Sequence, residues 1–291
     1  MKVAAFTIIR NAEKFDYPVK ESILSVLPLV DLFIVSIGQS EDNTESIIQS
    51  IHSDKIKIVH SIWDDSLRQG GQLLSIETNK AKTHIPSDID WCFYIQSDEV
   101  IHENDYDKIY QSMHQHLSNN EVEGLLFHYH HFFGNYDYIA VSRQWYRHEI
   151  RIIRNHPNIV SYKDAQGFRK TNNKKLKVKD TGAYIYHYGW VRHPQAQLEK
   201  QKHFHKLWHD DEWIQKNMDE EKILSYKIND LLTPFTGTHP AIMHERIKKY
   251  NWSFEYNPQT ICLPLKEKFL YTLEKLIKYR IGEYKNYVLL K

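Results

Sequence analysis

Short apolar runs alternate with amphipathic segments along the first third of the chain. The apolar runs that are too short for helices, and that predict strands, are Val3–Ile9, Asp31–Ile37, Lys55–His60 and Trp91–Ile95. The segments that carry apolar residues at helical spacing, and that predict helices, are Val19–Leu27, Glu45–Ile51 and residues 68–84. Strands that alternate with helices in this way are typical of an α/β fold, in which helices flank a mostly parallel central sheet.

The pattern changes after Glu103, where longer strand-like segments follow a predicted helix. The segments with strand patterns are Glu123–Phe133, Ile150–Arg154 and Ala183–Tyr188. Those with helical patterns are Asp105–Leu117, Ala196–Asp210, Glu212–Leu224 and Leu265–Tyr279. The basic segment Lys170–Lys179 predicts a loop or a hairpin tip. We expect one domain over residues 1–194, with halves 1–104 and 105–194, and a mostly helical C-terminal extension over residues 195–291 that packs on it.

The apolar run Trp91–Ile95 leads into two adjacent carboxylates, Asp98 and Glu99. In open α/β sheets, ligands bind outside the carboxyl ends of the strands. Two neighbouring acids at that edge favour a positive partner, and a divalent cation that bridges to a diphosphate is one such partner. The alternative is that Asp98 caps the next turn while Glu99 is solvated.

Composition narrows the class of protein. The chain of 291 residues has a formal net charge of +1, so no basic excess indicates a nucleic-acid partner. Aromatic residues make up 13% of the chain, and their flat rings suit the apolar faces of sugars as well as protein cores. The two cysteines form no disulfide framework, Met1–Arg10 does not predict a signal peptide, and no apolar run has the length of a membrane span. A reducing, cytoplasmic location is the expectation.

Several segments occur in the same order as in a known family of enzymes. They are Phe6–Asn11, Ser40–Thr44, Arg68, Asn79–Ala81 and Gln96–Glu99. With these segments the first third resembles glycosyltransferase family two, the nucleotide-sugar-dependent transferases of the Rossmann-like GT-A fold. In that family an Asp-any-Asp motif after a buried strand holds the divalent metal that bridges to the sugar-nucleotide diphosphate. Here Gln96 stands at the first acidic position and Asp98 at the last, so one charge of the motif is missing.

The resemblance implies roles for individual residues and a nucleoside-diphosphate sugar as the donor. Asp98 is expected to bind Mn²⁺ or Mg²⁺ directly, with Gln96 beside the nucleotide-sugar. Arg68 is expected to approach the base or the phosphates. The residues expected to frame the base and ribose are Ile9, Arg10 and Asp42.

The second half is similar to bacterial members of this group that build surface polysaccharide or the lipopolysaccharide core. Those proteins carry an Arg-rich strand, then an acidic residue and later a His-Tyr-Gly segment, which here are Arg151–Arg154, Asp164 and His187–Gly189. The His-any-Gly cluster, followed by Arg192 and Pro194, more loosely resembles the His and basic residue that complete the metal and diphosphate site in other GT-A enzymes. This resemblance implies that His187 is a second metal ligand and that Arg192 lies near the departing phosphate. The alternative for His187 is a histidine hydrogen-bonded at a strand end. The implied acceptor is a hydroxyl of a glycan or of a lipid-linked molecule.

A sugar transfer of this kind needs a base, because the acceptor hydroxyl must lose its proton as it attacks. Asp164 is the first candidate and Glu149 the second, and a salt bridge to a nearby arginine is the alternative reading of each. The bound metal stabilises the charge of the departing nucleotide, and direct attack inverts the anomeric centre. The candidate stacking surfaces for the acceptor sugar are Trp145, Tyr146 and Trp190.

Two other functions and one other partner are open from the sequence alone. A sugar-nucleotide nucleotidyltransferase uses a related sheet but needs a glycine-rich loop after its first strand, and Ile9–Lys14 contains no glycine. A non-catalytic carbohydrate-binding or scaffolding protein keeps the aromatic surface without needing Asp98. The last helix, Leu265–Tyr279, interleaves lysines with apolar residues. We expect it either to pack on the domain or to make a peripheral membrane contact.

Overall fold

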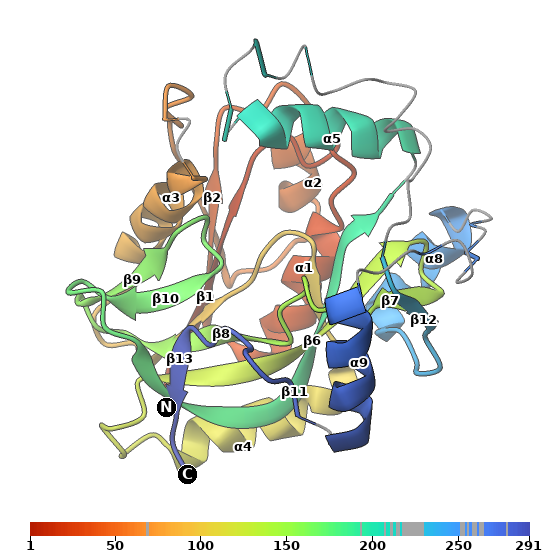
Figure 1. Cartoon of the computed structure of the whole chain (residues 1–291). Helices are drawn as coiled ribbons and strands as arrows, with labels where there is room; N and C mark the ends of the chain where they lie inside the picture. The colour runs from red at the N-terminus through yellow and green to blue at the C-terminus, as the bar shows by residue number, and fades with distance from the viewer. Residues whose placement is uncertain are drawn as a thin grey trace.

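One mixed sheet forms the centre of the computed structural model (Figure 1). Its strands, in the order in which they pair, are β12 (Leu232–Pro234), β7 (Tyr138–Ala140), β6 (Gly124–Gly134), β8 (His148–Arg154), β4 (Trp91–Tyr94), β1 (Val3–Ile9), β2 (Leu32–Ile37) and β3 (Ile56–His60). The long strand β11 (Leu176–Val191) pairs with β6 and also with two short strands, β5 (Glu99–Ile101) and β13 (Tyr287–Leu289). The structure describes residues 1–67, 70–192, 194–206, 208–209, 212–213, 216, 230–250, 254, 256–257, 261, 265–277 and 279–291.

The first third of the chain has the predicted α/β arrangement. Strands β3, β2, β1 and β4 pair in parallel, and every predicted strand in this part is present. The helices that connect and flank them are α1 (Val19–Val26), α2 (Thr44–Gln49), α3 (Gln72–Thr83) and α4 (Tyr106–Gln115), with short 3-10 helices at Leu27–Leu29 and Glu103–Asp105. The expected fold class is confirmed.

The sheet is buried on both faces because successive side chains of β1 point to opposite sides. Val3, Ala5 and Ile9 belong to a core cluster that also contains apolar residues of α1, α2 and α4. Phe6 and Ile8 belong to a second cluster, with α3 and a separate antiparallel hairpin. That hairpin consists of β9 (Ile159–Tyr162) and β10 (Gly167–Lys170). The central strands therefore lie inside a three-layered structure.

The second half departs from the prediction in its strands. Strand β8 pairs antiparallel with both β4 and β6, whereas β11 runs parallel to β6. The basic segment Lys170–Lys179 is only partly a loop, because Lys170 ends β10 and Leu176 begins β11. The short strands that the apolar pattern did not predict are β5, β7, β9, β10, β12 and β13. Each of these has too few residues to show a reliable period.

Beyond residue 194, the described residues form α5 (Pro194–Lys206), a 3-10 helix at Ala241–Met243, α8 (His244–Tyr250) and α9 (Leu265–Ile277). The predicted helix Glu212–Leu224 lies almost wholly outside the described residues. Strands β12 and β13 also follow residue 194 and join the central sheet through β7 and β11. The division into a domain and an extension stays a prediction.

The strands β1, β2 and β4 end at the same edge of the sheet, because parallel neighbours point the same way. Helix α5 lies across this edge, far along the chain from the strands that it covers (Figure 1). The loops that follow β1 and β4 thus face a helix that comes from the C-terminal third.

Candidate active site

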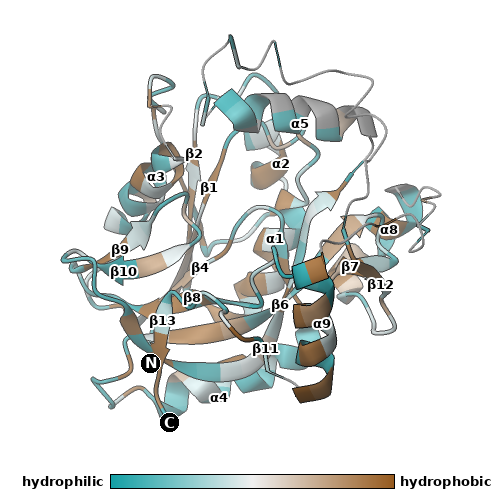
Figure 2. Cartoon of the chain, viewed as in Figure 1, coloured by the Kyte–Doolittle hydropathy of each residue, from teal (hydrophilic) through white to brown (hydrophobic). Residues whose placement is uncertain are grey.

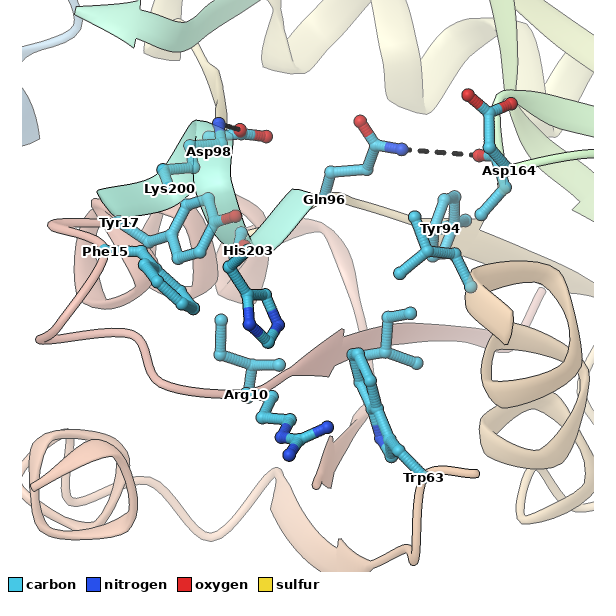
Figure 3. A pocket seen from close by; sticks show the side chains of 15 residues that line it. Arg10, Phe15, Tyr17, Trp63, Tyr94, Gln96, Asp98, Asp164, Lys200 and His203 are labelled. Atoms are coloured by element: carbon cyan, nitrogen blue, oxygen red, sulfur yellow. Dashed lines mark hydrogen bonds and ion pairs between the residues drawn. The ribbon is translucent and has the colours of Figure 1, made fainter. Parts of the chain in front are cut away.

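Two adjoining cavities lie at this edge of the sheet. The smaller has a volume of about 140 Å³, and we call it the β1 cavity. Its wall includes Ile9, Arg10, Phe15, Tyr17, Trp63 and His203 (Figure 3). The larger has a volume of about 580 Å³, and we call it the glutamine cavity because its wall includes Gln96, Gln166, Gln197 and Gln201. Residues common to both walls include Gln96, Asp98, Asp164 and Lys200.

Asp98 lies where the two cavities meet, as its position after β4 predicted. Lys200 of α5 donates from Nζ to Asp98 Oδ2 at 3.2 Å, and Figure 3 shows the two side chains together. Burial alone would raise the pKa of Asp98, but the charges of Lys200, His187 and Arg192 hold it at about 2. Asp98 is therefore an ionised carboxylate at any physiological pH.

His187 lies beside Asp98, with 3.8 Å between His187 Nε2 and Asp98 Oδ1. Its other ring nitrogen, Nδ1, is 3.0 Å from Nδ1 of His131. His131 Nε2 is in turn 2.7 Å from the backbone oxygen of Tyr146. Burial lowers the pKa of both histidines, so both rings are neutral.

These contacts fix which nitrogen of each ring carries the proton. The oxygen of Tyr146 can only accept, so His131 Nε2 donates to it and His131 Nδ1 is left as an acceptor. His187 Nδ1 must then donate to His131, which leaves His187 Nε2 without a proton. A bare nitrogen lone pair therefore lies next to an ionised carboxylate, an arrangement that a cation between them would stabilise.

Asp98 and His187 suit a divalent metal ion as two of its ligands. Their donor atoms are a carboxylate oxygen and an unprotonated imidazole nitrogen, both usual ligands of Mn²⁺. Within the described residues, no group of three His, Cys, Asp or Glu side chains could hold a metal on its own. The remaining positions would have to come from a ligand and water, as they do at many sites that bind nucleotide phosphates.

Glu99 does not share the environment of its neighbour, contrary to the expectation that both acids face a ligand. It is fully buried, and Arg151 donates to its two oxygens at 2.8 and 2.7 Å. Tyr129 Oη donates to Oε1 at 2.8 Å, and the backbone N–H of Gln96 donates to Oε2 at 3.1 Å. Glu99 thus ties β8 and β6 to the loop that carries Asp98.

Asp164 lies in the loop between β9 and β10, and it lines both cavities. Its two neighbours, Lys163 and Ala165, have left-handed φ angles of 56° and 60°. Such backbone is costly for residues with a side chain and is found where the surrounding structure holds a loop in place. Burial raises the pKa of Asp164, which makes its carboxylate a stronger base.

Glu149, the second candidate base, is buried behind the wall of the glutamine cavity. Gln166 is part of that wall, and its Nε2 donates to Glu149 Oε1 at 3.0 Å. Burial raises the pKa of Glu149 to about 8, so near neutral pH it is mostly protonated and cannot accept a proton. Neither acid forms an ion pair with an arginine that the structure describes, because Arg151 binds Glu99. Asp164 is the better placed of the two.

The structure separates the residues predicted to frame the base and ribose. Ile9 and Arg10 line the β1 cavity, where Arg10 binds Asp65 with two bonds of 2.6 and 3.0 Å. Asp42 lines neither cavity. Its oxygens accept from the backbone N–H groups of Lys14 at 2.8 Å and Thr44 at 3.0 Å. These bonds join the loops after β1 and β2, so Asp42 shapes the loop beside Arg10, and its contact with a nucleotide stays a prediction.

Two further predicted phosphate contacts have different outcomes. Arg68 lies outside the described residues. Arg192 is fully buried and lines neither cavity, because it donates to the backbone oxygen of Phe15 at 2.9 Å and lies over the Tyr17 ring. It acts on the site through its charge instead. Burial, and then the charge of Arg192, lower the pKa of Lys200 to about 7, although Asp98 opposes this shift.

Of the three aromatic residues predicted to bind an acceptor, two line the glutamine cavity. Tyr146 and Trp190 are part of its wall, and the Trp190 ring is stacked on Phe133 with 5.8 Å between centroids. Trp145 donates from its indole nitrogen to Asp230 and lines a neighbouring cavity, whose wall also includes Tyr146 and residues of α9. Its ring lies edge-on to Trp190, with 5.9 Å between centroids, and its contact with an acceptor stays a prediction.

Sequence reasoning missed several residues of the site. Phe15, Tyr17 and Trp63 line the β1 cavity, and Lys200 and His203 reach it from α5 (Figure 3). Trp63 follows β3, so the strand-end rule that identified Asp98 also covered this position. The sequence contained one indication that α5 contributes to the site. Gln197, Lys200 and Gln201 are spaced three and four residues apart from Gln197, so they share one polar face of the helix.

No protein-family model and no curated protein matches this chain. Among solved structures, it is similar to glucosyl-3-phosphoglycerate synthase from Mycobacterium tuberculosis. For that enzyme with Mn²⁺, uridine diphosphate and phosphoglyceric acid, identity is 17%, coverage 44% of this chain and 43% of that chain, and the TM-score 0.32. For the same enzyme with Mg²⁺ and uridine diphosphate, identity is 19%, the match covers 44% of this chain and 43% of that chain, and the TM-score is 0.31. The match spans less than half of either chain, and at these scores it does not identify an activity.

Proposed function

We propose that the protein is a GT-A type glycosyltransferase that moves a sugar from a nucleoside-diphosphate donor to a hydroxyl of a glycan or lipid-linked acceptor. The observation that carries this proposal is the arrangement at Asp98. There an ionised carboxylate and a bare histidine nitrogen lie between a small aromatic cavity and a larger polar one. The aromatic walls of the first cavity suit the base of a nucleotide, and the polar walls of the second suit a hydroxyl-bearing acceptor.

In this proposal Asp98 and His187 hold Mn²⁺ or Mg²⁺, which would supply Lewis-acid stabilisation of the departing diphosphate. Arg10 and the Trp63 ring bind and orient the nucleotide in the β1 cavity. The Lys200 ammonium, which lines both cavities, is released from Asp98 and pairs with phosphate oxygens.

Asp164 accepts the proton of the attacking hydroxyl at its carboxylate. It lines the glutamine cavity as well as the β1 cavity, so it can reach an acceptor placed beside the donor. Direct attack from that side inverts the anomeric centre. By the resemblance of the second half, the product belongs to bacterial surface polysaccharide or lipopolysaccharide.

A thermal-shift experiment tests the donor site. The protein is heated with uridine, guanosine, adenosine or cytidine diphosphate, in Mn²⁺ or in EDTA. We expect one diphosphate to raise the melting temperature only when Mn²⁺ is present. Asp98→Asn should abolish this rise, and Asp107→Asn, on the exposed surface of α4, should retain it. A rise that persists in EDTA or in Asp98→Asn would contradict the proposal and favour a binding protein that does not use the acid.

We also propose that α9 contacts the cytoplasmic face of a membrane. Leu265, Phe269 and Leu276 of α9 are 85%, 67% and 76% exposed, and Figure 2 shows hydrophobic segments along this helix. Exposed lysines lie among them, whereas Glu274 is neutralised by Arg143 at 2.8 Å. Apolar side chains beside lysines favour anionic lipid. None of the described helices is long and apolar enough to cross a bilayer.

Vesicle co-sedimentation tests this contact. We expect binding to vesicles that contain phosphatidylglycerol and much less binding to pure phosphatidylcholine. Phe269→Glu should remove the binding, and Tyr110→Glu, which changes another exposed ring, on α4, should not. The membrane contact would be overturned if the protein bound both kinds of vesicle equally, or if Phe269→Glu bound anionic vesicles as well as the natural protein does. Neither result would affect the catalytic proposal.

A further inference from the structure

The wall of the glutamine cavity has a composition that bears on what it binds. Its carboxamides come from three separate parts of the chain. Gln96 follows β4, Gln166 precedes β10, and Gln197 and Gln201 lie on α5. A carboxamide offers one acceptor oxygen and two N–H donors, so several of them suit a ligand whose groups both donate and accept.

One of these carboxamides is incompletely bonded. Gln197 is only 3% exposed, and its Oε1 has no hydrogen-bond partner among the residues that the structure describes. A buried amide oxygen without a donor costs free energy comparable to that of a lost hydrogen bond. Because Gln197 lines the cavity, a hydroxyl group bound there could donate to it.

The charges of the wall disfavour an anion. Its ionisable groups are Asp98 and Asp164, which are acidic, and Lys200, which is bonded to Asp98 at 3.2 Å. Among the described residues of the wall there is no arginine. In the proposed complex the donor diphosphate engages Lys200 and the metal ion on Asp98, so a phosphate or carboxylate on the acceptor would meet Asp164 and no unengaged cation among the described residues of the wall.

We infer that the glutamine cavity binds an uncharged, hydroxyl-rich acceptor, such as the neutral sugar at the end of a glycan. Gln197 and Gln201 bind its hydroxyl groups, and the Trp190 and Tyr146 rings contact its apolar face. The inference rests on the proposed function, because it names the class of acceptor for that same transferase site.

Saturation-transfer NMR tests the inference with defined probes. The full chain, with diamagnetic Mg²⁺ and the diphosphate that stabilises it, is mixed with methyl glucoside, methyl galactoside, glucuronate and glycerol 3-phosphate at equal concentrations. We expect signals from the neutral glycosides and none above background from the two anions. Gln197→Ala should weaken the glycoside affinity about fivefold, the effect of one lost hydrogen bond. Gln111→Ala, on the exposed surface of α4, should leave it unchanged.

A second variant keeps the inference testable if Gln197→Ala fails to fold. Gln201→Lys adds a cation to the less buried end of the α5 face, and we expect it to gain binding of glycerol 3-phosphate.

Stronger binding of an anion by the natural protein, or a foldable Gln197→Ala with unchanged glycoside affinity, would overturn the inference. Metal-dependent diphosphate binding without glycoside binding overturns this inference alone. Glycoside binding without any diphosphate effect overturns the proposed function instead.

Discussion

Asp98 and Glu99 are neighbours in the chain, yet each lies in a different kind of region. Glu99 is 0% exposed and accepts four hydrogen bonds, two of them from the Arg151 guanidinium. Asp98 is 8% exposed, and its closest ion pair among the described residues is with Lys200, at 3.2 Å. We call Glu99 with Arg151 the sealed pair, and Asp98 with Lys200 the open pair.

The difference shows that one carboxylate stabilises the fold and its neighbour is available to a ligand. The planar guanidinium matches both oxygens of Glu99, and the remaining acceptor positions are filled by Tyr129 and a backbone N–H. No ligand can enter such a site without removing one of these groups. In the open pair a lysine supplies one point charge from the end of a flexible stem. A metal ion or a phosphate can therefore exchange with it at small cost.

The largest expected effect separates the two pairs by stability. Glu99→Gln removes the charge that balances a fully buried Arg151, and we expect it to lower the free energy of unfolding by about 3–5 kcal/mol. Asp98→Asn should cost less than about 1 kcal/mol, because Lys200, with a pKa of about 7, can lose its proton when its partner is gone.

Urea denaturation near neutral pH, without divalent metal, measures both changes. Asp107→Asn gives the background for an exposed acid on α4. Similar losses for Glu99→Gln and Asp98→Asn would show that the two pairs are equally structural, and the distinction between sealed and open would be wrong.

The sequence predicted the place of Asp98 but neither the partner of Asp98 nor that of Glu99. Apolar runs located β1, β2, β3 and β4, and the strand-end rule then placed Asp98 at a ligand site. The partner of Glu99 could not be found in this way, because Arg151 meets it only after β8 has paired with β4 in an antiparallel direction. That pairing is a tertiary choice, and no local pattern specifies it.

Position in the chain does not by itself determine which groups a side chain binds. Asp42 follows β2 as an acid that binds a nucleotide would, but nearby backbone N–H groups take up its oxygens. Short polar side chains in loops often bond to backbone in this manner. Lys200 is the opposite case. Its segment is rich in Gln, Lys and His and has no clear apolar face, so only the fold shows that α5 crosses the edge of the sheet.

The smaller expected effect concerns His131, which holds His187 beside the open pair. His131 accepts from His187 Nδ1 and donates to the backbone oxygen of Tyr146, so it holds His187 with Nε2 bare beside Asp98. His131→Phe keeps a buried ring but removes both bonds. We expect the affinity for Mn²⁺ to fall about 10- to 100-fold, which is the usual cost of losing a residue that orients a metal ligand.

Titration of free Mn²⁺ by electron paramagnetic resonance measures this affinity directly, without relying on turnover. His131→Asn should restore part of it, because an asparagine oxygen can take the place of the Nδ1 acceptor and again bind the His187 N–H. His130→Phe, the matched change on the opposite face of β6, should leave Mn²⁺ binding unchanged. If His131→Phe binds Mn²⁺ as the natural protein does, then His187 is no ligand. Asp98 would then bind the Lys200 ammonium alone, with no metal ion between Asp98 and His187.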